Sequence, residues 1–132
     1  MYSPHPNPSQ RDQVEPYLTK DGSQIRELMH PAVHGNRAQS LAEALLPPGG
    51  CTLLHRHHLS EELYYVTSGH GVMTLGERRF LIRPGDTVAI PPGTAHGLEN
   101  TGEEALVVLC ACSPAYRHED TELLEPAPGA GA

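Results

Sequence analysis

The sequence has no tryptophan and only one phenylalanine among 132 residues, so little aromatic surface is available for stacking a large ring ligand. Lysine and arginine are also scarce, since nine of them stand against 16 aspartate and glutamate residues, and the formal net charge is −7 with histidine neutral. Nucleic acids and anionic membranes favour clustered cations, so we expect neither as a partner. A small polar or carboxylate-bearing molecule is the better-supported ligand.

Long apolar runs are missing as well. No window approaches the roughly 18 to 20 apolar residues of a membrane span, and residues 1–10 are proline-rich and polar where a signal peptide would be apolar. The three cysteines are an odd number, which fits a reducing compartment better than a disulfide framework. These features predict a cytoplasmic protein. We expect Cys110 and Cys112 to be buried thiols, with pocket lining or metal contact as the alternative.

Glycine and proline are abundant, at 13 each, and they separate short apolar or β-branched runs. Recurring turn signals between these runs favour many short strands over a few long helices. Strands joined so closely pair antiparallel, and closure into a barrel removes exposed edges. The predicted fold class is therefore all-β, a jelly-roll barrel. The predicted strands are 25–29, 39–46, 51–56, 62–67, 72–75, 78–82, 87–90, 96–99 and 105–112.

The length of the chain predicts one domain with one core. We place the barrel at 21–125, after a flexible N-terminal segment at 1–20. The tail at 126–132 contains only Pro, Gly and Ala and is predicted to be disordered. Segment 40–46 is rich in Ala, Leu and Glu, which favour a helix locally, although a helix there would not move the candidate site.

Three histidines and one glutamate form the most informative pattern. His55 and His57 alternate on a predicted strand, so both imidazoles point the same way and can reach one ion. Glu62 follows at an odd step, so residues 58–60 must turn or bulge to return it to that side. His96 comes from a distant segment and supplies a third imidazole. Such a donor set suits one divalent transition-metal ion, either Mn, Fe, Co, Ni, Cu or Zn, whereas Mg and Ca prefer oxygen donors throughout.

These residues match two spacings. G-x5-H-x-H-x4-E-x6-G is met from Gly49 to Gly69, and G-x5-P-x-G-x2-H-x3-N is met from Gly85 to Asn100. All ten fixed positions are filled, and the two patterns together resemble the paired motifs of the cupin superfamily. The resemblance covers 47–114 and implies a cupin-type double-stranded β-helix, in which the metal ligands are His55, His57, Glu62 and His96. The motif glycines, Pro91 and Asn100 resemble turn formers, because glycine permits positive φ and asparagine tolerates it.

Alternation along the strand after Glu62 places Tyr64 and Val66 inside the barrel and Tyr65 outside. Tyr64 is the candidate catalytic residue, either a proton donor or a substrate contact, and the alternative is a core tyrosine with a satisfied hydroxyl. Core packing is expected for Met73, Phe80 and Ile82.

Polar residues near the motifs are expected to be mostly solvated. The neighbours His58 and Glu61 are assigned a solvated or indirect role, and His118, Glu119 and Asp120 form a predicted solvated charge run. The segment before the first motif could cap the barrel mouth, where an arginine could clamp a substrate carboxylate, although a surface position is expected for these side chains. They are Arg26, His30, His34, Arg37 and Gln39.

Two functions from different classes fit the pattern. The first is a metal-dependent enzyme of the dioxygenase, isomerase or lyase type. The second is a non-catalytic protein that uses the same ion to bind a sugar or organic acid, since the resemblance does not select a reaction. Acyl transfer and nucleotide chemistry lose support, because no G-x-S-x-G elbow or dinucleotide fingerprint is present. A homodimer is expected, because edge strands of small jelly rolls are often covered by a partner.

Overall fold

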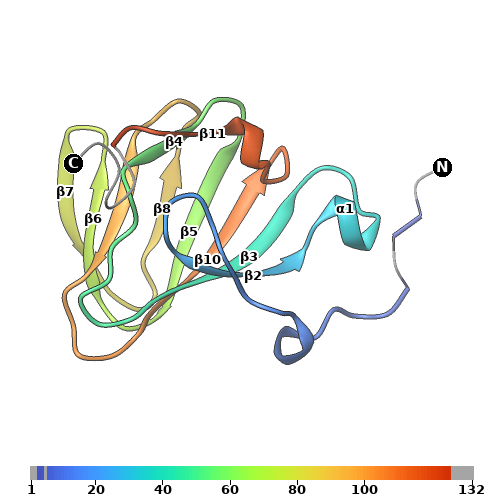
Figure 1. The fold of residues 1–132 in the computed structure, drawn as a ribbon, viewed down its shortest axis with the longest axis horizontal. Coiled ribbons are helices and arrows are strands. Elements are labelled where there is room, and N and C mark those ends of the chain that lie inside the picture. The colour runs from blue at the N-terminus through green and yellow to red at the C-terminus, as the bar shows by residue number, and fades with distance from the viewer. Residues whose placement is uncertain (1–2, 5, 126–132) are drawn as a thin grey trace.

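Strands with alternating buried and exposed side chains make up most of the computed structural model, which describes residues 3–4 and 6–125. Two antiparallel sheets face each other as in a jelly-roll barrel, so the predicted all-β class is confirmed (Figure 1). The strands are β1 (Tyr17–Leu18), β2 (Gln24–Met29), β3 (Ser40–Leu46), β4 (His55–His57), β5 (Glu61–Ser68), β6 (Gly71–Leu75), β7 (Arg78–Ile82), β8 (Thr87–Ile90), β9 (His96–Asn100), β10 (Leu106–Ser113) and β11 (Thr121–Leu123).

One sheet has the order β1-β2-β3-β10-β5-β8 and the other has the order β11-β4-β9-β6-β7. The helical elements in the described residues are short: η1 (Arg11–Gln13), α1 (Pro31–His34) and η2 (His118–Asp120). None of the helices in the described part of the chain has the length and apolar character needed to span a membrane.

Segment 40–46 shows why pairing decides the conformation. Its residues favour a helix locally, yet β3 is a strand because it lies between β2 and β10 and pairs with both. Alternate residues Ala42, Ala44 and Leu46 are buried in the core, while Leu41 faces outward. Tertiary contacts thus override helix propensity here.

The core lies between the two sheets. Met73 and Ile82 are buried as predicted, and Phe80 is partly buried against the same cluster. Cys110 and Cys112 are buried free thiols as predicted, and both also line the internal cavity, which was the alternative, whereas Cys51 is exposed. The predicted strand at 51–56 is shorter than expected, because regular pairing begins only at His55 and Cys51 forms an isolated bridge with Glu99.

Turns confirm the expected conformation of the motif glycines and correct that of Asn100. Gly69, between β5 and β6, has φ of 77°, and a Cβ there would collide with the backbone of Ala105. No described non-glycine residue has a positive φ, so Asn100 is not in the left-handed conformation. It still forms the turn through its buried side chain, which accepts the backbone N–H of Gly102 at 2.9 Å and donates to the carbonyls of Leu46 and Glu104.

The predicted tail at 126–132 lies outside the described residues, as do residues 1, 2 and 5. The described part of segment 1–20 contains η1 and β1, and β1 pairs with β2. The flexibility of this segment stays a prediction.

Candidate metal centre

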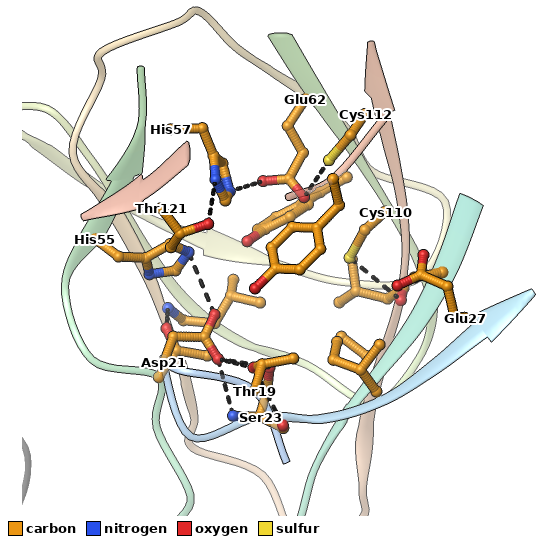
Figure 2. A pocket seen from close by; sticks show the side chains of 18 of the residues that line it. Thr19, Asp21, Ser23, Glu27, His55, His57, Glu62, Cys110, Cys112 and Thr121 are labelled. Atoms are coloured by element: carbon orange, nitrogen blue, oxygen red, sulfur yellow. Dashed lines mark hydrogen bonds and ion pairs between the residues drawn. The ribbon is translucent and has the colours of Figure 1, made fainter. Parts of the chain in front are cut away.

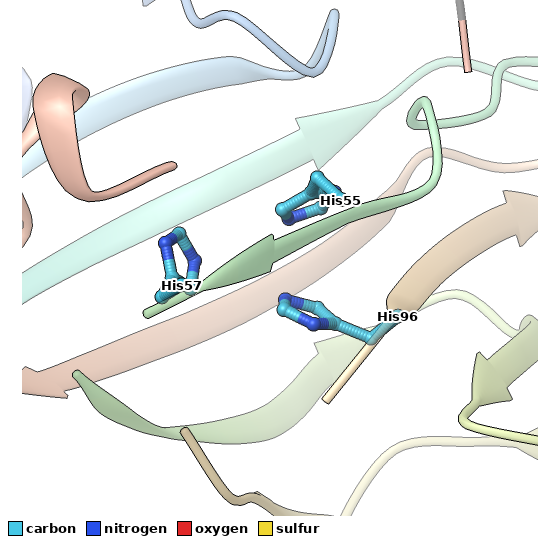
Figure 3. Close-up of side chains that lie close together, drawn as sticks. All are labelled: His55, His57 and His96. Atoms are coloured by element: carbon cyan, nitrogen blue, oxygen red, sulfur yellow. The ribbon is translucent and has the colours of Figure 1, made fainter. Parts of the chain in front are cut away.

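The three histidines of the motifs converge inside the barrel. His55 and His57 are alternate residues of β4, and His96 is the partner of His55 in the register between β4 and β9. All three are buried, and the candidate ligand atoms of the three side chains lie within 4.8 Å of one another. Figure 3 shows the three rings facing a common space. The sequence therefore predicted correctly that these side chains come together.

Glu62 reaches the same space because the chain bends after β4. Its Oε1 lies 3.2 Å from Nε2 of His57 and 3.2 Å from Nε2 of His96. The odd step from His57 to Glu62 predicted an irregularity at 58–60, and the chain bends there.

Asp120 holds this bend, so its assignment to a solvated charge run is wrong. The side chain is 7% exposed, and its two carboxylate oxygens accept the backbone N–H groups of Leu59 and Ser60 at 2.8 and 3.1 Å. Burial raises the pKa of Asp120, but these N–H donors outweigh it and lower the pKa below its usual value. His118 and Glu119 are exposed as expected.

Each imidazole uses Nδ1 for a hydrogen bond that leaves Nε2 directed at the centre. Nδ1 of His55 donates to the carbonyl of Leu53 at 2.7 Å, and Nδ1 of His96 donates to the carbonyl of Thr94 at 2.9 Å. For His57 the acceptor is Thr121 Oγ1 at 3.0 Å.

The Thr121 hydroxyl donates its own hydrogen to the Arg117 carbonyl and therefore accepts from His57. In a neutral ring, a hydrogen on Nδ1 leaves the free lone pair on Nε2. Three lone pairs consequently point into one space.

These atoms fit a bound cation. Glu62 Oε1 and His96 Nε2 are buried, and neither has a hydrogen-bond partner among the described residues. Buried polar atoms without partners are costly, and a divalent ion would satisfy both. Three imidazole nitrogens and a carboxylate oxygen are donors that Zn, Fe, Mn and related ions accept. The three histidines can thus hold a metal ion.

The charge states support the same conclusion. Burial raises the pKa of Glu62, but hydrogen bonds and positive charge from His57 and His96, which a bound cation would replace, outweigh it and hold the pKa at about 2. Glu62 is therefore ionised at neutral pH. The pKa of His55 is lowered, chiefly by burial, which favours the neutral ring that metal binding requires. The thiol of Cys112 donates to Glu62 Oε2 at 3.3 Å and so orients that carboxylate.

Asp21 lies beside His55 of the centre, and sequence reasoning missed it. Its Oδ2 is 3.3 Å from His55 Nε2. Figure 2 shows Asp21 and Glu62 reaching the histidines from different elements. No spacing rule marks Asp21, because it stands in the turn between β1 and β2, far from both motifs in sequence.

A cavity of about 50 Å³ adjoins the centre inside the barrel (Figure 2). Its wall includes apolar side chains such as Ile25 and Leu98, together with the acidic side chains of Asp21, Glu27 and Glu62. No lysine or arginine is found among the described residues that line it. Tyr64 and Val66 are buried and Tyr65 is exposed, so the predicted alternation along β5 is confirmed, and Tyr64 lines the cavity.

The other candidates from the sequence do not enter this cavity. Arg26 lies 3.9 Å from Glu43 rather than on the cavity wall. His30 borders a second groove, which shares Tyr17, Glu27 and Tyr116 with the cavity wall, and its ring donates to the Tyr116 carbonyl. The exposed residues are His58, Glu61, Arg37 and Gln39. The N-terminal residues that do border the cavity include Tyr17, Thr19, Asp21 and Ser23.

Comparison with known proteins finds relatives that match more than half of the chain. The uncharacterized protein MJ1618 of Methanocaldococcus jannaschii is 54% identical over 114 residues, which are 86% of this chain and 91% of that protein. The oxalate-binding protein of Thermotoga maritima is 36% identical over 84 residues, which are 64% of this chain and 65% of that protein.

Among solved structures, a predicted oxalate decarboxylase from Thermotoga maritima superposes with a TM-score of 0.71 at 27% identity. The match covers 80% of this chain and 97% of that chain. Residues 42–112 match the family model described as a cupin domain. They include His55, His57, Glu62 and His96. The chain therefore belongs to the cupin family.

Proposed function

We propose that this protein is a metal-dependent enzyme that acts on a small polar molecule. The observation that carries the proposal is the convergence of three buried imidazoles beside the buried Glu62 carboxylate, where Glu62 Oε1 and His96 Nε2 have no hydrogen-bond partner among the described residues. His55, His57, His96 and Glu62 would hold one divalent ion. When bound, such an ion supplies Lewis-acid polarisation of a substrate oxygen.

The residues around the centre would orient and protect a small substrate. Apolar side chains of β2, β3 and β10 exclude water from one side of the cavity. A cavity of about 50 Å³ favours a ligand of few atoms unless the mouth widens. Because no described lining residue is cationic, the arginine clamp considered for a carboxylate-bearing ligand has no support.

Tyr64 is the proposed catalytic residue. Its ring packs edge-on against His96 with centroids 5.8 Å apart, and its side chain is 5% exposed. Burial raises the pKa of Tyr64 well above its usual value, so the hydroxyl keeps its proton at neutral pH. It would therefore donate a hydrogen bond or proton to the substrate rather than accept one.

A second candidate is a non-catalytic protein that binds a small molecule through the same ion. The 36% identity to the oxalate-binding protein of Thermotoga maritima favours it. Both functions use the same four ligands, so turnover decides between them. The wall of acidic and apolar groups is a poor match for a free dianion, which favours the enzyme and a different ligand.

The direct test measures metal and turnover together. Protein purified without added metal is analysed for its elements, stripped, and reloaded with Fe, Mn or Zn. Candidate aldoses and organic acids are then followed by oxygen uptake and product analysis. We expect one ion per chain and turnover of at least one compound that His96→Ala abolishes. Tight ligand binding with no turnover of any compound would instead support the binding protein.

We also propose a cytoplasmic homodimer. All three cysteines are free thiols, as a reducing compartment allows. Leu41 on β3 and Leu63 and Tyr65 on β5 are exposed on one sheet, and only β10 separates the two strands. Contiguous exposed apolar groups mark association surfaces. Light scattering should give a dimer that Leu63→Glu dissociates and Thr67→Glu, farther along β5, does not. A monomeric parent protein would contradict the dimer.

A further inference from the structure

The turn between β1 and β2 presents one carboxylate oxygen of Asp21 to the metal centre. Oδ1 of Asp21 accepts hydrogen bonds from the Thr19 hydroxyl at 2.7 Å, the Ser23 backbone N–H at 2.9 Å and the Ser23 hydroxyl at 2.7 Å. Three donors fix the orientation of the carboxylate. The other oxygen, Oδ2, is left to face His55.

This turn is tied to the segments that carry the ligands. The backbone N–H of Leu53, two residues before His55, donates to the Asp21 carbonyl at 2.7 Å. The Lys20 ammonium donates to the carbonyl of Thr121 at 2.8 Å, and Thr121 is the residue that orients His57. Asp21 is therefore held on the same rigid frame as the histidines.

The contact between Asp21 and His55 is unfavourable without a cation. When the His55 ring is neutral, Nδ1 donates to Leu53 and Nε2 presents a lone pair to Asp21 Oδ2 at 3.3 Å. Glu62 Oε1 likewise faces Nε2 of His57 and Nε2 of His96, at 3.2 Å from each. Two donors about 2.1 Å from one ion and at right angles lie about 3.0 Å apart, close to all three distances.

We propose that Asp21 is a second carboxylate ligand of the ion that His55, His57, His96 and Glu62 hold. The inference rests on the proposed function and narrows its substrate. Two carboxylates neutralise a divalent ion, and Glu27 adds another acidic group to a wall without described cations. Five protein donors leave one position on a six-coordinate ion. The substrate class is therefore a neutral molecule bound through one hydroxyl or carbonyl oxygen, rather than a chelating dicarboxylate.

Asp21→Asn tests the ligand role, because the amide keeps an oxygen for Thr19 and Ser23. The matched control is Glu27→Gln, which removes a carboxylate of the same cavity that contacts no histidine of the centre. Each protein is titrated with Co²⁺, whose visible absorption reports coordination number, and calorimetry gives the affinity. We expect Asp21→Asn to bind Co²⁺ at least tenfold more weakly with a changed spectrum, while Glu27→Gln keeps the parent spectrum.

Metal-free melting separates a ligand from a residue that only braces the turn. Without metal, Asp21→Asn should melt no lower than the parent, because an amide N–H facing Nε2 replaces the repulsive contact. Formate, a single-charge probe, should bind the Co²⁺ form of Asp21→Asn more tightly than the parent.

A Co²⁺ spectrum unchanged by Asp21→Asn would overturn this inference alone. A parent protein that binds no Co²⁺ would overturn the proposed function and the inference with it.

Discussion

Replacing Asp120 with alanine tests whether the bend at 58–60 builds the metal centre. The change removes two charge-assisted hydrogen bonds, to the N–H groups of Leu59 and Ser60 at 2.8 and 3.1 Å. Such bonds contribute about 1.5–3 kcal/mol each. Leu59 is exposed and water can replace its partner, so we take the low end of the range and expect a loss of about 3 kcal/mol. At about 3–5 °C per kcal/mol for a domain of this size, the melting temperature falls by about 10–15 °C.

The same substitution should weaken metal binding, because Glu62 lies just beyond the bend. Loss of a group that orients a ligand typically costs about 10–100-fold in metal affinity. Melting of the metal-free protein and calorimetric titration with Zn²⁺ measure the two effects. The control is Glu119→Ala, which removes an exposed neighbouring carboxylate and should change neither. If Asp120→Ala melted within about 2 °C of the parent and kept its affinity, our account of the bend would be refuted.

Further predictions concern pH, metal, Tyr64 and two turns. Because the pKa of Asp120 is lowered in the folded state, its contribution is present above the ordinary value of 3.8 and is lost as pH falls below it. The melting difference between the parent and Asp120→Ala should therefore be constant from pH 8 to 5 and shrink below about pH 4, and a constant difference at pH 3.5 would be contrary evidence. Metal at about 100 times its Kd should stabilise the parent by about 2.7 kcal/mol, or about 8–13 °C in a thermal melt, and chelation should reverse this. Tyr64→Phe should lower kcat on any substrate found by about 100-fold or more while leaving the Zn²⁺ affinity within about twofold; unchanged kcat would return Tyr64 to the core. Gly69→Ala should destabilise the protein far more than Gly85→Ala in urea unfolding, because both glycines have positive φ but only a Cβ at Gly69 meets neighbouring backbone; equal effects would contradict this.

Much of the fold follows from local pattern. Alternation predicted which side chains of β5 face the core. Glycines in the turn signals predicted where strands turn, and the motif glycines have positive φ in the structure. Segment 40–46 shows the limit, because its helix-forming residues become a strand only through pairing with β2 and β10. Such pairing depends on residues far away in the sequence, which local propensity does not include.

The site divides in the same way. The four motif residues could be predicted because alternation places His55 and His57 together and the family spacing adds Glu62 and His96. Asp21 and Asp120 could not, since the turn that brings Asp21 beside His55 and the helix η2 that brings Asp120 to the bend at 58–60 are positioned only in the folded chain. Asp120 in particular stands in a charged run that is typical of solvated surface. In the folded chain its carboxylate is buried because it accepts the backbone N–H groups of Leu59 and Ser60.

The most direct test of the central claim is an anomalous-scattering map of crystals grown with one equivalent of Mn²⁺ or Zn²⁺. Our account predicts one strong peak per chain, about 2.0–2.2 Å from Nε2 of the three histidines and from an oxygen of Glu62. A peak at another place, or well-ordered crystals in which these side chains bind no ion, would contradict it.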